Sequence, residues 1–153
     1  MSRFRVQFAQ VEHGWAHAVF EVEEKTYDFQ FSRVVYGDAF ARLCEALGAL
    51  AEENWPQTVT WMGEPQQYEV RFSKTADEIQ LEMWRFEGHE RSLASAPELE
   101  FAVSGTYDEI CLPLWRALRT LQGLYSESAF KIRWRYEFPT RELAHLTELL
   151  GKT

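Results

Sequence analysis

The residues in this chain most suited to metal chemistry are its histidines, of which there are four. His13 and His17 are four positions apart, a spacing that brings two metal ligands together on a helix. The local pattern instead places them in a hairpin turn and in the following strand, where four residues span roughly 13 Å. His89 lies in a polar loop, and His145 lies on the polar side of a helical pattern. The sequence therefore predicts no metal site.

The two cysteines, Cys44 and Cys111, each lie among apolar neighbours in a helical pattern. This setting favours two reduced core thiols, with a disulfide or redox pair as the alternative. The eight glycines are scattered singly, and neither a glycine-rich phosphate loop nor a nucleophile elbow is present. We therefore expect no catalytic residue and no cofactor.

Acidic residues outnumber basic ones, and the excess is uneven along the chain. The net charge is −8, made up of −4 in residues 1–54, −5 in residues 55–105 and +1 in residues 106–153. An acidic surface attracts basic proteins and repels phosphate backbones and anionic lipids. We expect a basic protein partner, no nucleic acid and no membrane, although solubility alone would also explain the charge.

One segment departs from the acidic character. Residues 131–136 alternate Lys131, Arg133 and Arg135 with Ile132, Trp134 and Tyr136, which resembles a basic strand. Interleaved arginine and aromatic side chains can pair with phosphates and stack on bases. Because the whole chain is acidic, we interpret the cations as a solvated face, with a protein contact or nucleic acid as alternatives.

The elements that must position these residues are indicated by alternation of apolar and polar side chains with a period of two. This period is typical of antiparallel strands with one face in water. The apolar sets are Phe4, Val6, Phe8; Ala16, Ala18, Phe20, Val22; Tyr27, Phe29, Phe31; Val59, Trp61; Tyr68, Val70, Phe72; Ile79, Leu81, Met83; and Leu99, Phe101, Val103.

Three helical patterns accompany these strands. The first begins at the N-cap Asp38, the second at a capping box formed by Thr106 and Glu109, and the third at about Thr140. Pro113 should kink the second helix or delay its start. The polar stretch 87–97 is expected to be a mobile loop.

The sequence thus predicts a single α+β domain over residues 1–153. It comprises a mostly antiparallel sheet of about seven strands in meanders, one helix after the third strand, and two C-terminal helices packed on the sheet. Residues 1–10 lack a signal-peptide core, and no stretch reaches the roughly 20 apolar residues that span a bilayer. We expect a cytoplasmic protein.

The wet face of the predicted sheet supplies the candidate binding residues. Trp84 falls out of phase with the apolar set before it and should lie on the face opposite the core, as an exposed interface anchor. A covering helix, or burial in a homodimer, would explain the same tryptophan. The candidate partner-binding residues are Glu21, Glu23, Asp28, Glu69, Glu78, Glu82 and Trp84.

A family resemblance rests on three features. A helix from Asp38 to Leu50 follows an extended strand, Trp61 precedes Pro65 and Tyr68, and Trp134 precedes Phe138-Pro139 and Leu143. In these features the chain resembles uncharacterised small bacterial proteins, some of them similar to immunity proteins of polymorphic toxin systems. The resemblance implies a stoichiometric inhibitor that blocks a toxin through an acidic surface, and it assigns no individual residue.

The alternative hypothesis is a small-molecule binding protein or an enzyme. Its pocket would lie between the sheet and the helices, lined by Tyr27, Trp61, Tyr68 and Trp115.

Overall fold

A computed structural model describes residues 3–32, 38–87 and 96–152 of the chain. Its seven strands form one antiparallel sheet in which spatial order follows chain order from β1 to β7. The strands are β1 (Phe4–Glu12), β2 (Trp15–Val22), β3 (Lys25–Ser32), β4 (Gln57–Met62), β5 (Gln67–Thr75), β6 (Glu78–Phe86) and β7 (Glu98–Gly105). The predicted α+β class and the meander topology are therefore confirmed.

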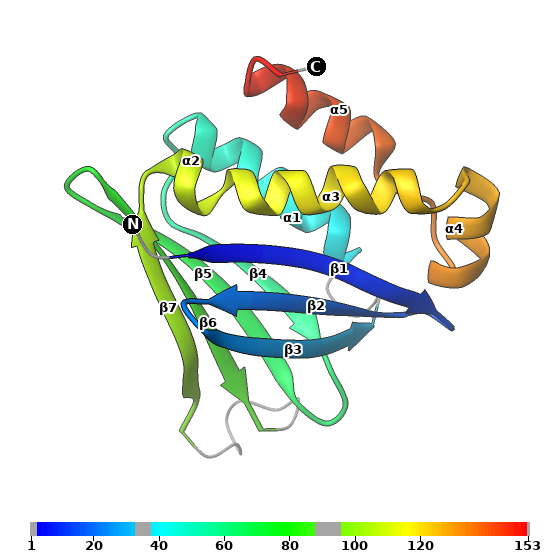
Figure 1. Ribbon diagram of the computed structural model, residues 1–153, viewed down its shortest axis with the longest axis horizontal. Helices are drawn as coiled ribbons and strands as arrows, with labels where there is room; N and C mark the ends of the chain where they lie inside the picture. The colour runs from blue at the N-terminus through cyan, green and yellow to red at the C-terminus, as the bar shows by residue number, and fades with distance from the viewer. Residues whose placement is uncertain (1–2, 33–37, 88–95, 153) are drawn as a thin grey trace.

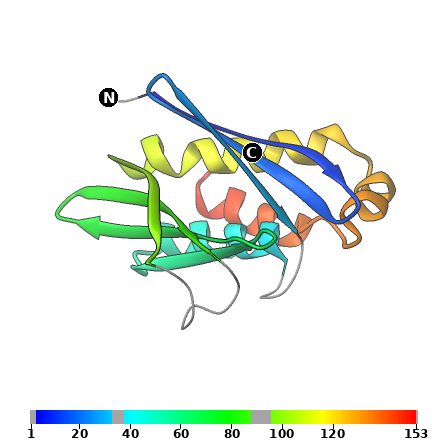
Figure 2. The same ribbon diagram turned by 90° about the horizontal axis from the view of Figure 1, so that it is seen from below.

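The sheet consists of two halves that cross one another. Strands β3 and β4 share a single paired position, Ser32 with Met62, whereas the other neighbours form long ladders. The half formed by β1 to β3 lies across the half formed by β4 to β7, as Figures 1 and 2 show. Backbone hydrogen bonds therefore contribute little to holding the two halves together.

Helices lie along one side of the sheet, at the top of Figure 1. They are α1 (Ala39–Ala51), α2 (Tyr107–Ile110), α3 (Leu112–Leu124), α4 (Glu127–Trp134) and α5 (Thr140–Leu149). Helix α3 packs on β1 and α1 on β4, while α5 packs mainly on α1. The Tyr107 hydroxyl donates to the Leu47 carbonyl at 2.8 Å, which ties α2 to α1.

An aromatic cluster fills the space between the two halves and the helices. The rings of Phe31 in β3 and Trp61 in β4 stack at 4.5 Å between centroids. Phe40 in α1 lies 5.6 Å from Phe31 and 4.7 Å from Trp134 at the end of α4. Each of these four side chains is at most 1% exposed. Burial of their apolar surface therefore joins four elements, β3, β4, α1 and α4, between which the backbone ladder supplies a single paired position.

The helix boundaries agree with the local signals in the sequence. The Asp38 side chain accepts from the Phe40 N–H at 2.9 Å, and Thr106 and Glu109 form the predicted reciprocal capping box. Pro113 lies in the first turn of α3, so it delays the start of the long helix as expected. The loop predicted over residues 87–97 lies mostly outside the described residues, as does His89.

The prediction of a basic strand over residues 131–136 is wrong. Residues 131–134 of this segment belong to α4, because Ser126 caps the helix by accepting from the Ala129 N–H, and Arg135 ends it in a left-handed conformation. Of its three large apolar side chains only Trp134 is buried, whereas Ile132 is 77% exposed. Among the described residues, no helix combines the length and the apolar character needed to cross a bilayer.

The Asp38 carboxylate gives a first prediction. One of its oxygens accepts from both the Phe40 N–H and the Trp134 Nε1–H, the latter at 3.2 Å. We expect Asp38→Ala to lower the free energy of unfolding by about 2 kcal/mol, because it removes the cap and leaves a buried indole N–H unpaired. Urea unfolding measures this loss. Asp38→Asn keeps an acceptor and is the control; an equal loss in both variants would contradict the hydrogen-bond explanation.

The pH dependence of the same residue is a second prediction. Burial, the largest influence, raises the Asp38 pKa above its ordinary value of 3.8. The folded protein therefore binds this proton more tightly than the unfolded chain, and stability from this group falls as pH rises from about 3.8 through the raised pKa. Between pH 3.8 and the raised pKa, we expect the free energy of unfolding of Asp38→Asn to increase relative to that of the parent. Above the raised pKa, the difference between the two free energies should stay constant. A difference independent of pH would contradict this account.

Candidate functional site

The candidate acidic residues fall into two groups, one on each half of the sheet. In the first half, Glu21 is half-exposed and lies 3.9 Å from Arg5, while the Asp28 carboxylate accepts from His17 Nδ1 at 2.8 Å. Glu23 lies in the exposed turn between β2 and β3, where its φ of +59° fits a tight two-residue hairpin. All three are accessible on or beside the outer face of this half.

The second group surrounds Trp84 on the outer face of β5 and β6. The Arg71 guanidinium lies 5.1 Å from the Trp84 ring centroid and 5.7 Å from that of Phe86. Trp84 Nε1 donates to Glu82 at 3.3 Å. Trp84 is half-buried, on the face opposite Met83 and Leu81, which are fully buried. This placement is the one predicted from its phase.

Two other members of the predicted set differ from one another. Glu69 is only 3% exposed and its carboxylate meets Arg71 Nε at 2.9 Å, so it supports the Arg71–Trp84 stack and cannot itself contact a partner. Alternation places Glu69 on the outer face of β5, which is correct, but it cannot predict that neighbouring side chains cover the carboxylate there. Glu78 is exposed where the β5–β6 hairpin turns, opposite Thr75.

Sequence reasoning placed Leu99 in the core with Phe101 and Val103, and this is wrong. The register between β6 and β7 shifts at Met83 and Trp84, so that Leu99 pairs with Trp84 while Phe101 pairs with Met83. Leu99 is therefore turned outward and is 46% exposed. The irregularity gives the outer face an apolar neighbour for Trp84 that period-two counting cannot detect.

A cluster of carboxylates that the sequence did not single out lies at the start of β7. Arg85 contacts Glu87 at 3.2 Å, Glu98 at 2.5 Å and Glu100 at 3.6 Å. One guanidinium thus faces three carboxylates, which leaves the group net negative. These acids raise the pKa of Arg85, although the largest influence on that group, desolvation, acts the other way.

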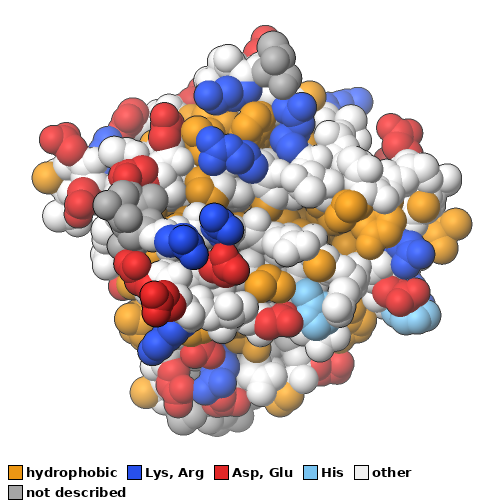
Figure 3. All heavy atoms as spheres, in the orientation of Figure 1, with side chains coloured by type: hydrophobic (Ala, Val, Ile, Leu, Met, Phe, Trp, Pro, Cys, Tyr) orange, Lys and Arg blue, Asp and Glu red, His pale blue; other side chains and the backbone are white. Residues whose placement is uncertain are grey.

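The charge asymmetry of the sequence becomes an asymmetry in space. Residues 1–105, with a net charge of −9, form the sheet and α1, whereas residues 106–153, with +1, form α2 to α5. Figure 3 shows basic side chains gathered over the upper side, above α3 and α5, and acidic ones around the strands and the left end. The part of the chain that contains the strands and α1 is therefore more acidic than the part that contains α2 to α5.

The nucleophiles and histidines show no catalytic arrangement in the described part of the chain. Burial raises the pKa of both the Cys44 and Cys111 thiols, so they are protonated at neutral pH. Both cysteines are buried and free, as predicted. Among the described residues no group of three or more His, Cys, Asp and Glu side chains could hold a metal ion.

The pocket of the alternative hypothesis is not assembled by the residues named for it. Trp61 is buried against Phe31, and Tyr68 packs edge to face on Phe29 at 5.1 Å. Trp115 lies on α3, where its Nε1 donates to the Thr147 hydroxyl at 3.0 Å, away from the inner face of the sheet. The aromatic side chains are therefore used in packing.

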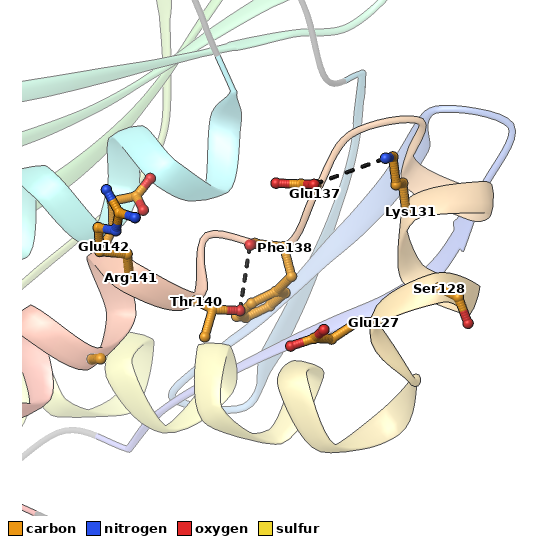
Figure 4. Close-up of a pocket in the computed structure, with 9 residues that line it drawn as sticks. Glu127, Ser128, Lys131, Glu137, Phe138, Thr140, Arg141 and Glu142 are labelled. Atoms are coloured by element: carbon orange, nitrogen blue, oxygen red, sulfur yellow. Dashed lines mark hydrogen bonds and ion pairs between the residues drawn. The ribbon is translucent and has the colours of Figure 1, made fainter.

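A cavity of about 750 Å³ lies elsewhere, between α4 and α5. Figure 4 shows Lys131 paired with Glu137 on one side and Arg141 and Glu142 together on the other. The Thr140 hydroxyl bonds to the Phe138 carbonyl and the Ser128 hydroxyl to Ser126, so neither is activated by a described base. The lining of this groove therefore combines charged side chains of both signs with hydroxyls that bond to neighbouring residues.

Comparison of the chain with protein-family models, with curated proteins and with solved structures finds no match.

The Glu69–Arg71 pair gives a third prediction. Arg71→Ala removes the cation beside a buried carboxylate, so we expect the free energy of unfolding to fall by about 2 kcal/mol. Adding Glu69→Gln should recover part of that loss, because the buried negative charge that has lost Arg71 is then gone. Urea unfolding of both variants and of Glu69→Gln alone completes the cycle. A double variant no more stable than Arg71→Ala would show that the ion pair is not the cause.

Proposed function

We propose that this chain is a non-enzymatic protein-binding module that engages a basic partner through the outer side of its sheet. The observation that carries the proposal is the spatial separation of charge, with the excess of acid on the sheet and a near balance on α2 to α5. Opposite potentials steer two proteins together and fix their relative orientation. A surface used only for solubility has no need of this separation.

The Trp84 region supplies an anchor for such a contact. Arg71 and Trp84 stack, Glu69 fixes Arg71 from beneath, and exposed Leu99 extends the apolar area beside the indole. Half-buried tryptophan with arginine, held in place before binding, is typical of the small groups that contribute most of the energy at interfaces. Acidic side chains at the periphery then give selectivity for cationic partners.

The partner we infer is a basic protein bound in a one-to-one complex, as an immunity-type inhibitor binds its toxin. Occupying a cationic substrate-binding surface would be enough to block an enzyme that acts on an anionic polymer, and no chemistry in the inhibitor would be required. We place the protein in the cytoplasm, an assignment supported by the two buried free thiols.

A fourth prediction compares two variants of equal charge. Glu23→Gln, Asp28→Asn and Glu78→Gln together remove three exposed charges from the sheet side and raise the net charge from −8 to −5. The control removes Glu127, Glu137 and Glu148 from the helical side by glutamine substitution, with the same change. We expect the first variant to lose about tenfold or more in affinity at low salt and the control to lose about twofold or less.

The measurement uses each purified chain as bait in lysate of the cell that encodes it, with quantitative mass spectrometry of the bound proteins at low and high salt. Support requires a basic protein retained at equal stoichiometry by the parent and the control and lost by the sheet-side variant. Equal retention by both variants, or retained proteins that are acidic and insensitive to salt, would overturn the proposal.

A further inference from the structure

The two outer strands of the sheet differ in how their edges are covered. Strand β1 is packed against α3 and α4, which run beside it in Figure 1. Strand β7 has its main helix contact with the short α2, which follows it directly after Gly105. Within residues 3–32, 38–87 and 96–152, β7 pairs with β6 alone. Its other edge is therefore open to a further strand.

Hairpin geometry identifies the backbone groups on that open edge. Ala76 and Asp77 form a two-residue turn between β5 and β6, so the flanking pair Thr75 and Glu78 exchanges both of its backbone hydrogen bonds. Because bonded and non-bonded pairs alternate, the next residue, Ile79, directs its N–H and C=O toward β7.

The same alternation then runs along β7. Ile79, Leu81 and Met83 pair with Gly105, Val103 and Phe101, so these three residues of β7 use their backbone groups on β6. The N–H and C=O of Ala102 and Ser104 are consequently directed away from the sheet. The side chains of Ala102 and Ser104 are small and exposed, so they do not block access to these backbone groups.

The surroundings of this edge are acidic and include two apolar anchors. Glu82 is the β6 partner of Ala102, and Glu98 and Glu100 share Arg85 with Glu87. Leu99 and Trp84 lie on the same outer face. The Tyr27 ring lies 5.0 Å from that of Phe101, which brings the acidic β2–β3 turn close to the middle of β7.

We propose that β7 is the docking strand of this protein, and that its occupant is an extended basic segment of the partner, which adds to the sheet as an eighth strand. This inference rests on the proposed function and deepens it by naming the site and the form of the partner. Backbone hydrogen bonds to Ala102 and Ser104 supply affinity, and alternating cationic side chains meet the carboxylates. A second copy of the chain is a poorer occupant, because each copy would bring the same carboxylates to the joint.

The experiment selects peptides from a displayed library of random 12-residue sequences, with the full chain as bait. The expected winners alternate Lys or Arg with β-branched or aromatic residues and lack proline. A synthetic winner is then titrated against the parent, Ala102→Pro and Ala102→Thr. Proline removes the outward N–H at an edge position that tolerates it, whereas threonine retains the N–H and the strand preference.

We expect Ala102→Pro to weaken peptide binding by about tenfold or more and Ala102→Thr by about twofold or less. Hydrogen exchange of the parent is the second measurement and does not depend on the variant folding. The Ala102 and Ser104 amides should exchange at least about tenfold more slowly with peptide bound. Unchanged exchange at both amides would overturn the proposal.

The other outcomes separate this inference from the proposed function. If Ala102→Pro binds as the parent does but the triple variant of Glu23, Asp28 and Glu78 does not, the docking strand is wrong and the acidic binding side stands. If no basic sequence is enriched, the docking strand is overturned, and the acidic binding side is decided separately by the lysate capture with the sheet-side and control variants. Light scattering that shows a dimer abolished by Ala102→Pro would assign the edge to a second copy and overturn the basic occupant.

Discussion

The burial of aromatic rings between the two halves of the sheet is the constraint on which the rest of the structure depends. With one paired position between β3 and β4, the crossing of the halves is set by how Phe31 and Trp61 stack, and by Phe40 and Trp134 closing over them. Dense packing of large planar side chains tolerates little displacement. The position of β7 relative to the β2–β3 turn follows, since Phe101 packs against Phe20 and Tyr27.

Because the interior is filled by these aromatic side chains, few of its described residues carry reactive groups. The aromatic residues that suggested a ligand pocket are consumed in joining the halves, and the buried thiols lie in apolar surroundings that keep them protonated. The Asp38 carboxylate lies beside the aromatic cluster, where it caps α1 and accepts from Trp134. The function that we propose therefore uses the outer face and the free edge of the sheet, where the exposed acidic side chains and Trp84 lie.

Much of the fold could be predicted because local signals agreed with the final packing. Alternation indicated the strands, and the capping residues Asp38, Thr106 and Glu109 indicated two helix starts, those of α1 and α2. The wrong predictions share a physical cause: contacts with neighbouring elements determined the structure where the local alternation of side chains indicated something else. Residues 131–136 alternate like a strand, yet capping by Ser126 and burial of Trp134 make a helix; Leu99 counts as core until a register shift turns it outward. The burial of Glu69 likewise depends on tertiary packing, and the open edge of β7 required the strand order.

The basic partner that we propose would bind the sheet side of this molecule. Zero-length cross-linking between carboxylates and lysines tests this contact most directly, because only carboxylates in contact with a partner's amines become coupled. After cross-linking in lysate of the cell that encodes the chain, the account predicts intermolecular links at the sheet-side residues Glu23, Glu78, Glu82, Glu98 and Glu100. Links confined to Glu127, Glu137 and Glu148 on the helical side would contradict it.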